Sequence, residues 1–336
     1  MARVLVLGGT RFLGPPIVQR LVEGGHEVTV FHRGEREPVV AGDVQHVHGA
    51  FSQLPDFVSR LSRRRPEVVL DVVPYIDKGG HGVRHFVGSA DRAVVVTSLD
   101  VYRAFAILWG TEGGNPPQPM PVTEDSATRA GRAPDLGPEI DFDNLEVEQA
   151  LARDPALPVT VLRLPAIYGA GDPQRRLARY VRRMNDRRAA IVLDERVARL
   201  RWSRGYVENV AAAIVMAATD ERAAGRIYNV AEPTVQTWAE WLADIANVCD
   251  WRGEVVALPR EELPDSLRAS WMAAEQDLYA SSTRLREELG YEEPTTIGEG
   301  LRRAVEWEVD QERDEPPPDY ADEDRVLSRL HPPSNA

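Results

Sequence analysis

The N-terminal segment combines an apolar run with three glycines, and this combination restricts the fold more than any other part of the chain. Residues 3–14 read RVLVLGGTRFLG, which predicts a buried strand, a glycine turn and the start of a helix. Gly8 permits the tight turn, Gly14 permits close packing of helix on strand, and the helix start after Gly14 offers amides to a pyrophosphate. The segment therefore predicts a nucleotide site, with a turn that binds nothing as the alternative.

Short apolar runs alternate with helical patterns over the first half of the chain. Residues 27–32, 68–73, 92–98 and 159–165 are dense in Val and Leu, which is typical of strands buried on both faces of a parallel sheet. Helical patterns cover residues 16–26, 56–64 and 140–153. This alternation predicts an α/β fold built on a doubly wound parallel sheet with right-handed crossovers.

The pattern changes after residue 168, where helical segments dominate. We expect residues 1–168 and about 206–232 to form a nucleotide-binding domain, and residues 169–205 and about 233–312 a smaller, mostly helical lobe. Residues 313–336 are acidic and proline-rich, which predicts a loosely attached or disordered tail. Residues 111–139 form a long loop poor in apolar side chains, and loops of this length are usually functional or mobile.

The net charge and the numbers of cysteine and histidine residues limit which ligands and partners the protein can bind. The formal net charge of −13 argues against a nucleic-acid binder and against attachment to an anionic membrane surface. The single cysteine, Cys249, excludes a disulfide within the chain, and the seven histidines lack HExxH spacing, so we expect no dedicated metal site. The sequence shows neither a signal-peptide pattern nor an apolar run of about 20 residues. A cytoplasmic protein that binds a small molecule is the simplest interpretation.

Five segments carry a pattern that is shared with a known superfamily. They are GGTRFLG (8–14), VVVTSLDVY (94–102), VLRLPAIYGAGDP (161–173), RGYVENVAAAI (204–214) and GRIYNVAE (225–232). Together they resemble the extended and atypical short-chain dehydrogenase/reductase superfamily, in its epimerase/dehydratase branch, over about residues 1–310. The resemblance implies a Rossmann domain with a small C-terminal substrate lobe, NAD or NADP as cofactor, and a homodimer as a common form. It does not single out one substrate.

The end of the second strand bears on the choice of cofactor. NAD-preferring sites usually place an acidic residue there to hold the ribose 2′-hydroxyl, whereas this chain offers His32 and Arg33, with Arg36 nearby. These cations favour the 2′-phosphate of NADP, and NAD is the alternative. Ala50 stands where the superfamily often has an adenine-binding aspartate, so adenine recognition falls to the backbone or to Phe51. The expected cofactor contacts are Gly8, Gly9, Thr10, Arg11, Phe12, Leu13, Gly14, His32, Arg33, Arg36, Phe51, Val73, Pro74, Thr97, Asn144, Pro165, Ala166 and Ile167.

Two polar residues follow the strand at 92–98. By the resemblance, Ser98 stands where the superfamily has a Ser or Thr that polarises the substrate oxygen. Asp100 falls where sugar-nucleotide dehydratases carry an acidic general base, and a carboxylate there can take a proton alpha to a carbonyl. A loop-capping role is the alternative for Asp100.

The helix after the long loop lacks the Tyr and Lys pair of the superfamily. With Glu148 as the anchor of the alignment, Asn144 stands at the lysine position and Ile140 at the tyrosine position, and residues 136–154 contain neither Tyr nor Lys. One interpretation is an enzyme whose chemistry needs only proton transfer, with Ser98, Asp100, Asp141 and Asn144 as candidate catalytic residues. The other is a non-catalytic NADP(H)-responsive binding or regulatory protein.

The substrate lobe supplies the remaining expectations. We expect a small polar substrate, such as an anionic nucleotide sugar or a secondary metabolite. Arginines recur over residues 175–183, where a solvated or salt-bridged face is the alternative to substrate binding. Residues 200–209 resemble a segment that borders the substrate cleft, and Tyr102 resembles a structural tyrosine of the family. The candidate substrate contacts are Tyr75, Lys78 (the only lysine of the chain), Tyr102, Arg175, Arg201, Trp202 and Arg204.

Overall fold

The computed structural model describes residues 1–35, 37, 42–73, 76–77, 80–134, 143–153, 156–312, 316 and 318–330. Its centre is a seven-stranded sheet in the order β12-β8-β7-β4-β1-β2-β3, and every neighbouring pair is parallel. The strands are β1 (Arg3–Leu7), β2 (Glu27–His32), β3 (Val44–His48), β4 (Val68–Asp71), β7 (Arg92–Ser98), β8 (Val159–Leu164) and β12 (Ile227–Asn229). The predicted α/β fold with a doubly wound sheet is confirmed.

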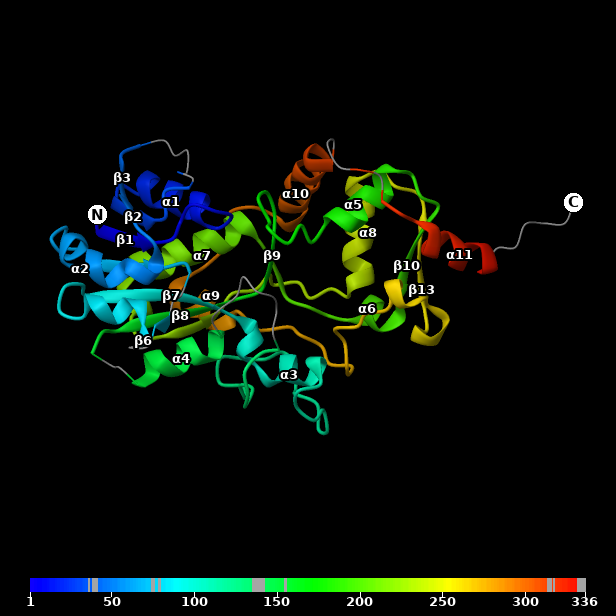
Figure 1. Ribbon diagram of the computed structural model, residues 1–336, viewed down its shortest axis with the longest axis horizontal. Helices are drawn as coiled ribbons and strands as arrows, with labels where there is room; N and C mark the ends of the chain where they lie inside the picture. Colours follow the sequence, from blue (N-terminus) through cyan, green and yellow to red (C-terminus); the bar gives the residue numbers. More distant parts are fainter. Residues whose placement is uncertain are drawn as a thin grey trace, which may run out of the picture.

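Helices cover both faces of this sheet, because alternate side chains of each central strand point to opposite sides and are apolar on both. One face packs against α1 (Gly14–Glu23) and α7 (Val207–Thr219). The other face packs against α2 (Leu54–Ser62), α4 (Asn144–Arg153) and the short 3-10 helix η2 (Gly82–Phe86). Of two further helices, α9 (Thr283–Leu289) packs beside the edge strand β12, and α3 (Arg103–Trp109) lies beyond the sheet towards the second part of the molecule (Figure 1).

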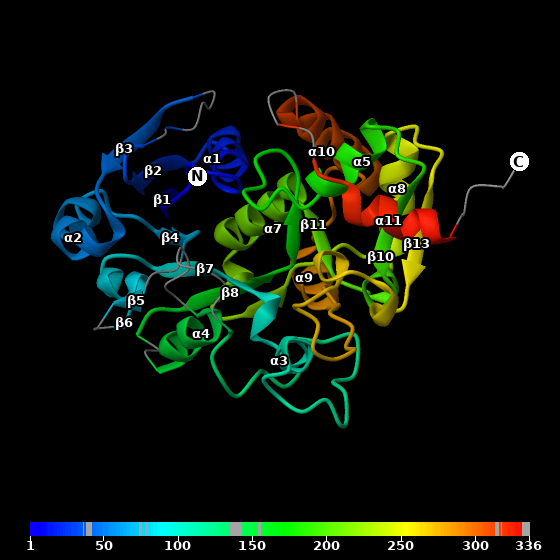
Figure 2. The same ribbon diagram turned by 45° about the vertical axis from the view of Figure 1, so that its right-hand side comes forward.

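The second part of the molecule is smaller and mostly helical, as predicted, and lies beside the sheet (Figures 1 and 2). Its helices are α5 (Ala178–Asn185), α6 (Glu195–Arg199), α8 (Trp238–Val248), α10 (Ile297–Glu312) and α11 (Ala321–Leu330). It also contains a parallel strand pair, β10 (Ala190–Asp194) and β13 (Glu254–Leu258), that the sequence did not predict. A second short pair, β9 (Ala166–Tyr168) and β11 (Arg204–Tyr206), joins the two parts. The antiparallel pair β5 (Ile76–Asp77) and β6 (Gly80–His81) follows β4.

The end of the chain corrects one expectation. Part of the acidic segment that was predicted to be loosely attached forms α11, which packs on β10. Glu323 is buried there and accepts hydrogen bonds from the Val192 amide at 3.1 Å and from Arg183 Nε at 3.1 Å. Val326 enters a small apolar cluster with Val192, Leu258 and Leu263. A buried carboxylate with two donors fixes the helix in spite of the acidic composition.

None of the helices in the described ranges has the length and apolar character of a membrane span.

Candidate active site

The carboxyl ends of the parallel strands meet at one edge of the sheet, and the predicted site residues gather there. From β1 the chain runs to β2 and β3 on one side, then crosses to β4, β7 and β8 on the other. In open α/β sheets, ligands bind in the crevice outside the carboxyl ends, where the strand order reverses. The glycine turn directly follows β1, Ser98 is the last residue of β7, and Pro165 directly follows β8, so the fold brings the predicted cofactor and catalytic segments to the same edge.

The turn between β1 and α1 requires glycine at two positions. Gly8 has a φ of +98°, which side chains rarely adopt. A Cβ on Gly14 would lie 2.1 Å from the carbonyl carbon of Gly9, so only glycine lets the helix start approach the turn this closely. Thr10, Phe12 and Leu13 lie half-buried between them. The loop has the geometry of the predicted pyrophosphate turn.

The start of α1 supplies fewer donors than the sequence argument assumed. Pro15 and Pro16 have no backbone N–H, and the Gly14 N–H donates to the Arg11 carbonyl oxygen at 2.8 Å. Within the described ranges, the amides of Phe12 and Leu13 donate to no protein acceptor. Free donors for a pyrophosphate therefore lie in the loop before the helix, and the expectation of amides after Gly14 is corrected.

A carboxylate lies among the cations that follow β2. Glu35 Oε2 is 2.7 Å from Nη2 of Arg11 and 3.4 Å from Nη2 of Arg33. The sequence argument counted only cations here, so that argument is corrected: the two arginines converge on one anionic group. All three side chains are at least half exposed, where ion pairs are weak and are readily exchanged for another anion.

His32 does not face the cofactor crevice in the way that the sequence predicted. Its side chain is buried, and its Nδ1 accepts a hydrogen bond from the Gly34 amide at 3.1 Å. Its Nε2 lies 2.9 Å from Nδ1 of His46. Because both ring nitrogens are engaged within the protein, we no longer expect a direct contact between His32 and a 2′-phosphate.

Three other predicted cofactor contacts have defined neighbours. The Thr97 hydroxyl donates to Glu148 Oε1 at 2.8 Å, so this side chain is turned away from the crevice and its predicted role is corrected. Phe51 packs edge-on against Phe31, with ring centroids 5.9 Å apart. Val73 is exposed, and its Cγ2 would be 3.1 Å from a Cβ on Gly8. Phe51 and Val73 thus border the crevice beside the turn.

The structure brings three of the predicted catalytic residues together. Ser98 ends β7 and its Oγ accepts a hydrogen bond from the Asp100 amide at 3.1 Å. Asn144 begins α4, and its Nδ2 donates to both carboxylate oxygens of Asp100, at 3.2 and 3.0 Å. The amide on the inner face of this helix therefore has a partner. Asn144, which the sequence analysis aligned with the lysine of the superfamily, therefore holds the Asp100 carboxylate through an uncharged donor.

Arg129, from the long loop, completes this cluster and was not singled out by the sequence. Its guanidinium is fully buried and donates to the Asp100 carbonyl oxygen at 2.9 Å and to Asp143 Oδ1 at 2.7 Å. Asp143 also accepts from the Leu145 amide at 2.8 Å and from the Ala133 amide at 2.7 Å, so it caps α4 and anchors the loop. Nothing in the local sequence distinguishes Arg129 from its neighbouring arginines, because its partners lie far along the chain.

The two carboxylates of this cluster differ in their electrostatics. Burial raises the pKa of Asp100 to about 6, although the charge of Arg129 and the hydrogen bond from Asn144 oppose this shift. Burial also acts on Asp143, but hydrogen bonds from Arg129 and from backbone amides outweigh it and hold its pKa below the usual range. Arg129 is within 2.7 Å of Asp143 but 3.9 Å from Asp100, which explains the difference. Asp100 is the carboxyl group that changes protonation close to neutral pH.

A buried hydrogen-bond network lies next to the cluster of Ser98, Asp100 and Asn144. Arg163 on β8 donates to Glu148 from Nη2 at 2.7 Å and to the Tyr102 hydroxyl from Nη1 at 2.8 Å. The Tyr102 hydroxyl donates in turn to Asn229 at 2.7 Å. Tyr102 is completely buried, so its place among the substrate contacts is wrong, and the structural role that the resemblance implied fits the geometry.

Arg204 lies on the β9–β11 pair, opposite Ala166. Its guanidinium stacks between Trp238 and Trp241, with its central carbon 5.1 and 4.3 Å from the two ring centroids. Nη2 is buried and meets no hydrogen-bond partner in the described part of the chain. Burial lowers the pKa of Arg204 to about 10, so the group stays charged at neutral pH. The charge of the nearby Glu232 opposes this lowering, so Arg204 already has one anionic neighbour, while its Nη2 stays without a hydrogen-bond partner among the described residues.

A cavity of about 540 Å³ lies in the smaller lobe and reaches Ala166, the first residue of β9. Its wall is aromatic and its polar groups are mainly arginines, among them Tyr180, Trp202, Trp238, Trp271, Arg176 and Arg179. Pro165 packs against Gly205, and Ile167 is buried, so the predicted nicotinamide-facing segment forms the inner end of this region. Ser98, Asp100 and Asn144 do not line the cavity.

Two predicted substrate contacts lie elsewhere. Arg175 forms an ion pair with the buried Glu308 of α10, with Nη2 at 2.8 Å from the carboxylate, so its predicted role is corrected to a structural one. Arg201 is half exposed and lies 3.7 Å from Asp277. The predicted residues that lie outside the described ranges are Arg36, Pro74, Tyr75, Lys78, Ile140 and Asp141.

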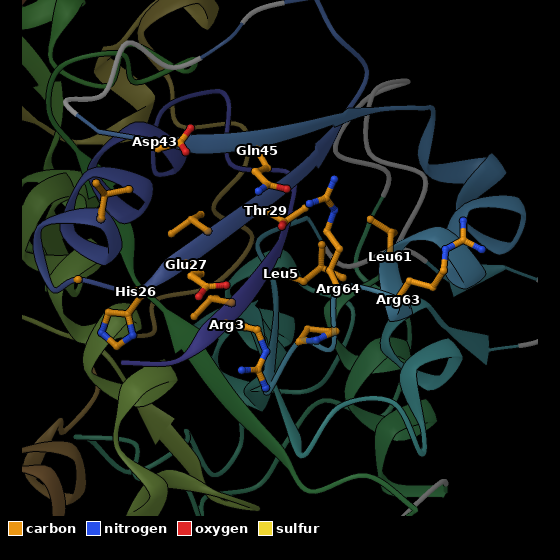
Figure 3. Close-up of a pocket in the computed structure, with 15 residues that line it drawn as sticks. Arg3, Leu5, His26, Glu27, Thr29, Asp43, Gln45, Leu61, Arg63 and Arg64 are labelled. Atoms are coloured by element: carbon orange, nitrogen blue, oxygen red, sulfur yellow. The ribbon is translucent and has the colours of Figure 1, made fainter.

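A second cavity, of about 620 Å³, lies at the amino ends of β1 and β2 (Figure 3). Arg3, Glu27, Gln45 and Arg64 contribute polar atoms to its lining. Arg3 is already paired with Glu67 at 2.8 Å. Because the strands are parallel, this cavity is at the opposite edge of the sheet from the glycine turn and Asp100, and it does not belong to the candidate site.

Comparisons with known proteins agree with this architecture. Residues 145–231 match the model of the NAD dependent epimerase/dehydratase family. A curated relative, 2′-dehydrokanamycin reductase of Streptomyces kanamyceticus, is 28% identical over 282 residues, which cover 82% of this chain and 71% of the relative.

Solved structures show the same fold over almost the whole chain. UDP-glucose 4-epimerase from Thermotoga maritima, solved with UDP-glucose, has a TM-score of 0.67 at 17% identity, covering 92% of this chain and 99% of that one. dTDP-glucose 4,6-dehydratase from Bacillus anthracis, solved with NAD, has a TM-score of 0.68 at 16% identity, covering 94% and 98%. The family match and the shared fold confirm the resemblance found in the sequence motifs. The chain is therefore similar to the NAD dependent epimerase/dehydratase family over residues 145–231, and it has the fold of the solved epimerases and dehydratases.

Proposed function

We propose that this protein is an NAD(P)-dependent enzyme of the epimerase, dehydratase or reductase class that acts on a small anionic metabolite, such as a nucleotide sugar. The observation that carries the proposal is the cluster of Ser98, Asp100 and Asn144 at the carboxyl end of β7, with the pKa of Asp100 at about 6. A general base or acid works best when its pKa lies near the working pH.

The residues divide the chemistry as follows. The bound nicotinamide cofactor supplies a hydride acceptor or donor. The Ser98 hydroxyl orients a substrate oxygen. The Asp100 carboxylate takes a proton from the substrate: the hydroxyl proton that is released when a hydride passes to the cofactor, or a proton on the carbon beside an existing carbonyl. Asn144 holds Asp100 through two neutral hydrogen bonds, and it adds no positive charge that would lower the pKa of the carboxyl group. The chain thereby replaces the Tyr and Lys relay of the superfamily with a carboxyl group of near-neutral pKa.

Removal of the Asp100 carboxylate is expected to lower turnover about 100-fold or more, which is the usual contribution of a general base. We expect D100N and S98A each to show this loss. The assay panel is UDP-glucose, UDP-glucuronic acid and dTDP-glucose with NADP⁺ or NAD⁺, read by NAD(P)H absorbance and by uptake of solvent deuterium. D91N, the same change just before the amino end of β7, is the matched control.

The pH dependence gives a second readout of the same assignment. A base must be ionised, so the rate is expected to rise with pH through about 6 and to level above it. In D100N, the residual rate is expected not to rise with pH around 6. Wild-type rates in both S98A and D100N would contradict the catalytic assignment. Cofactor binding with no turnover of the panel by the wild-type protein would favour the non-catalytic, NADP(H)-responsive interpretation.

We propose NADP rather than NAD as the preferred cofactor, because Arg11 and Arg33 converge on a single anionic point beside the end of β2. A 2′-phosphate at that point replaces Glu35 as their partner. Wild-type protein is expected to bind NADPH about tenfold or more tightly than NADH, and R33M to lose most of this difference. Fluorescence titration of both nucleotides measures it, with R63M, at the far end of α2, as control. Tighter binding of NADH would indicate that Glu35 holds the ribose 2′-hydroxyl instead.

Arg204 supports an anionic substrate. Its Nη2 is buried and has no partner among the described residues, and Ala166 and Trp238, which lie beside Arg204, line the aromatic cavity, although Arg204 itself does not. R204M keeps the shape of the side chain but not its charge, and it is expected to weaken binding of UDP-glucose about tenfold or more. R204K should recover part of the affinity. Tryptophan fluorescence measures the affinity for UDP-glucose, because Trp238 stacks on Arg204. R201M is the control; equal losses in R201M and R204M would overturn the assignment.

A further inference from the structure

The strand register gathers three imidazole rings at the carboxyl edge of the sheet. His46 and His48 are two residues apart on β3, so both side chains project from the same face of the strand. In the parallel β2–β3 pair, His32 is aligned with His48, and Val30 with His46. The pairing therefore brings His32 beside both residues of β3, although it lies 14 and 16 positions earlier in the chain.

The ring spacing agrees with that of histidines around one metal ion. The centroid of the His32 ring is 5.1 Å from that of His46 and 4.8 Å from that of His48. Two imidazoles on one tetrahedral zinc ion have ring centroids roughly 5 Å apart, given Zn–N distances of about 2.0–2.1 Å. His32 Nε2 and His46 Nδ1 are 2.9 Å apart, and a tetrahedral ion needs them slightly further apart, roughly 3.3 Å.

Glu37 supplies a carboxylate to the same place. One ligand atom from each of His32, His46 and Glu37 lies within 4.8 Å of the others. His48 lies outside this set of three, but its Nε2 is 3.0 Å from Oε1 of Glu37, as expected for a group that orients a ligating carboxylate. The Gly34 amide donates to Nδ1 of His32, which leaves Nε2 as the atom that faces the cluster.

The donor atoms of the cluster also suit a metal. Neutral imidazole nitrogens with a carboxylate oxygen are a ligand set that zinc binds in three-residue sites, with a fourth position left for water. The two nearby arginines, Arg11 and Arg33, are turned to Glu35.

We propose that His32 Nε2, His46 Nδ1 and the Glu37 carboxylate bind a divalent transition-metal ion of the zinc type, with His48 holding Glu37. The ion ties β3, which pairs only with β2 in the sheet, to the segment that follows β2. The site was missed in the sequence because its ligands are distributed over two strands and a loop, and no single spacing reveals it. The proposal does not depend on the catalytic role of Asp100.

The test uses the full-length chain without a histidine tag, stripped of metal and titrated with Zn²⁺ against a chromophoric chelator. We expect one equivalent to bind with a Kd of about a micromolar or tighter, and the melting temperature to rise with Zn²⁺. Co²⁺ should give the visible absorption of a tetrahedral site. H46A is expected to weaken Zn²⁺ binding about 100-fold, and H48A, which removes only the orienting group, about tenfold. H26A, at the opposite edge of the sheet, is the matched control.

E37Q is a second variant in case H46A fails to fold, because Glu37 is exposed and its substitution leaves the three imidazole rings in place. It should weaken Zn²⁺ binding about tenfold while the metal-free melting temperature stays unchanged. The proposal is overturned if wild-type protein shows no Zn²⁺ site tighter than about 100 μM. It is also overturned if H46A and E37Q bind Zn²⁺ as tightly as H26A. Since the readout is metal affinity, neither result bears on the proposed enzymatic function.

Discussion

The paired hydrogen bonds from Asn144 to the Asp100 carboxylate are the contact on which the account of the site depends. They connect the first residue of α4 to the loop after β7, and they do so without charge. A lysine at this position would hold the carboxylate ionised and bring its pKa down. The neutral amide leaves burial as the dominant influence, so the pKa of Asp100 rises towards neutrality. In the proposed function, this carboxyl group takes the place of the Tyr and Lys relay.

The surrounding ion pairs make this arrangement rigid. Arg129 is bonded to Asp143 and to the Asp100 backbone, which fixes both the cap of α4 and the loop that carries Asp100. One turn further along α4, Glu148 is held by Arg163 and Thr97. Buried pairs of this kind contribute little net stability but cost several kcal/mol, about 3–5, when one partner is removed. They hold the donor and the carboxylate in one geometry, which catalysis requires.

The sequence predicted the site residues whose position follows from the direction of the parallel strands. Ser98 and Asp100 follow a strand and Asn144 begins a crossover helix, so a parallel sheet brings them to one edge whatever the side chains are. Contacts that depend on distant partners were not predictable: Arg129, the pairing of Arg175 with Glu308, and the Glu35 carboxylate between Arg11 and Arg33. Composition also misled, because acidic residues suggested a loose tail where a single buried Glu323 anchors α11.

The most direct test of the central claim is the titration of the Asp100 carboxyl group, followed by ¹³C NMR in the wild-type protein and assigned by the loss of its signal in D100N. The account predicts an apparent pKa of about 6, and a further rise in N144L, where the two hydrogen bonds to the carboxylate are lost. An apparent pKa near the usual value of about 4, unaffected by N144L, would contradict it.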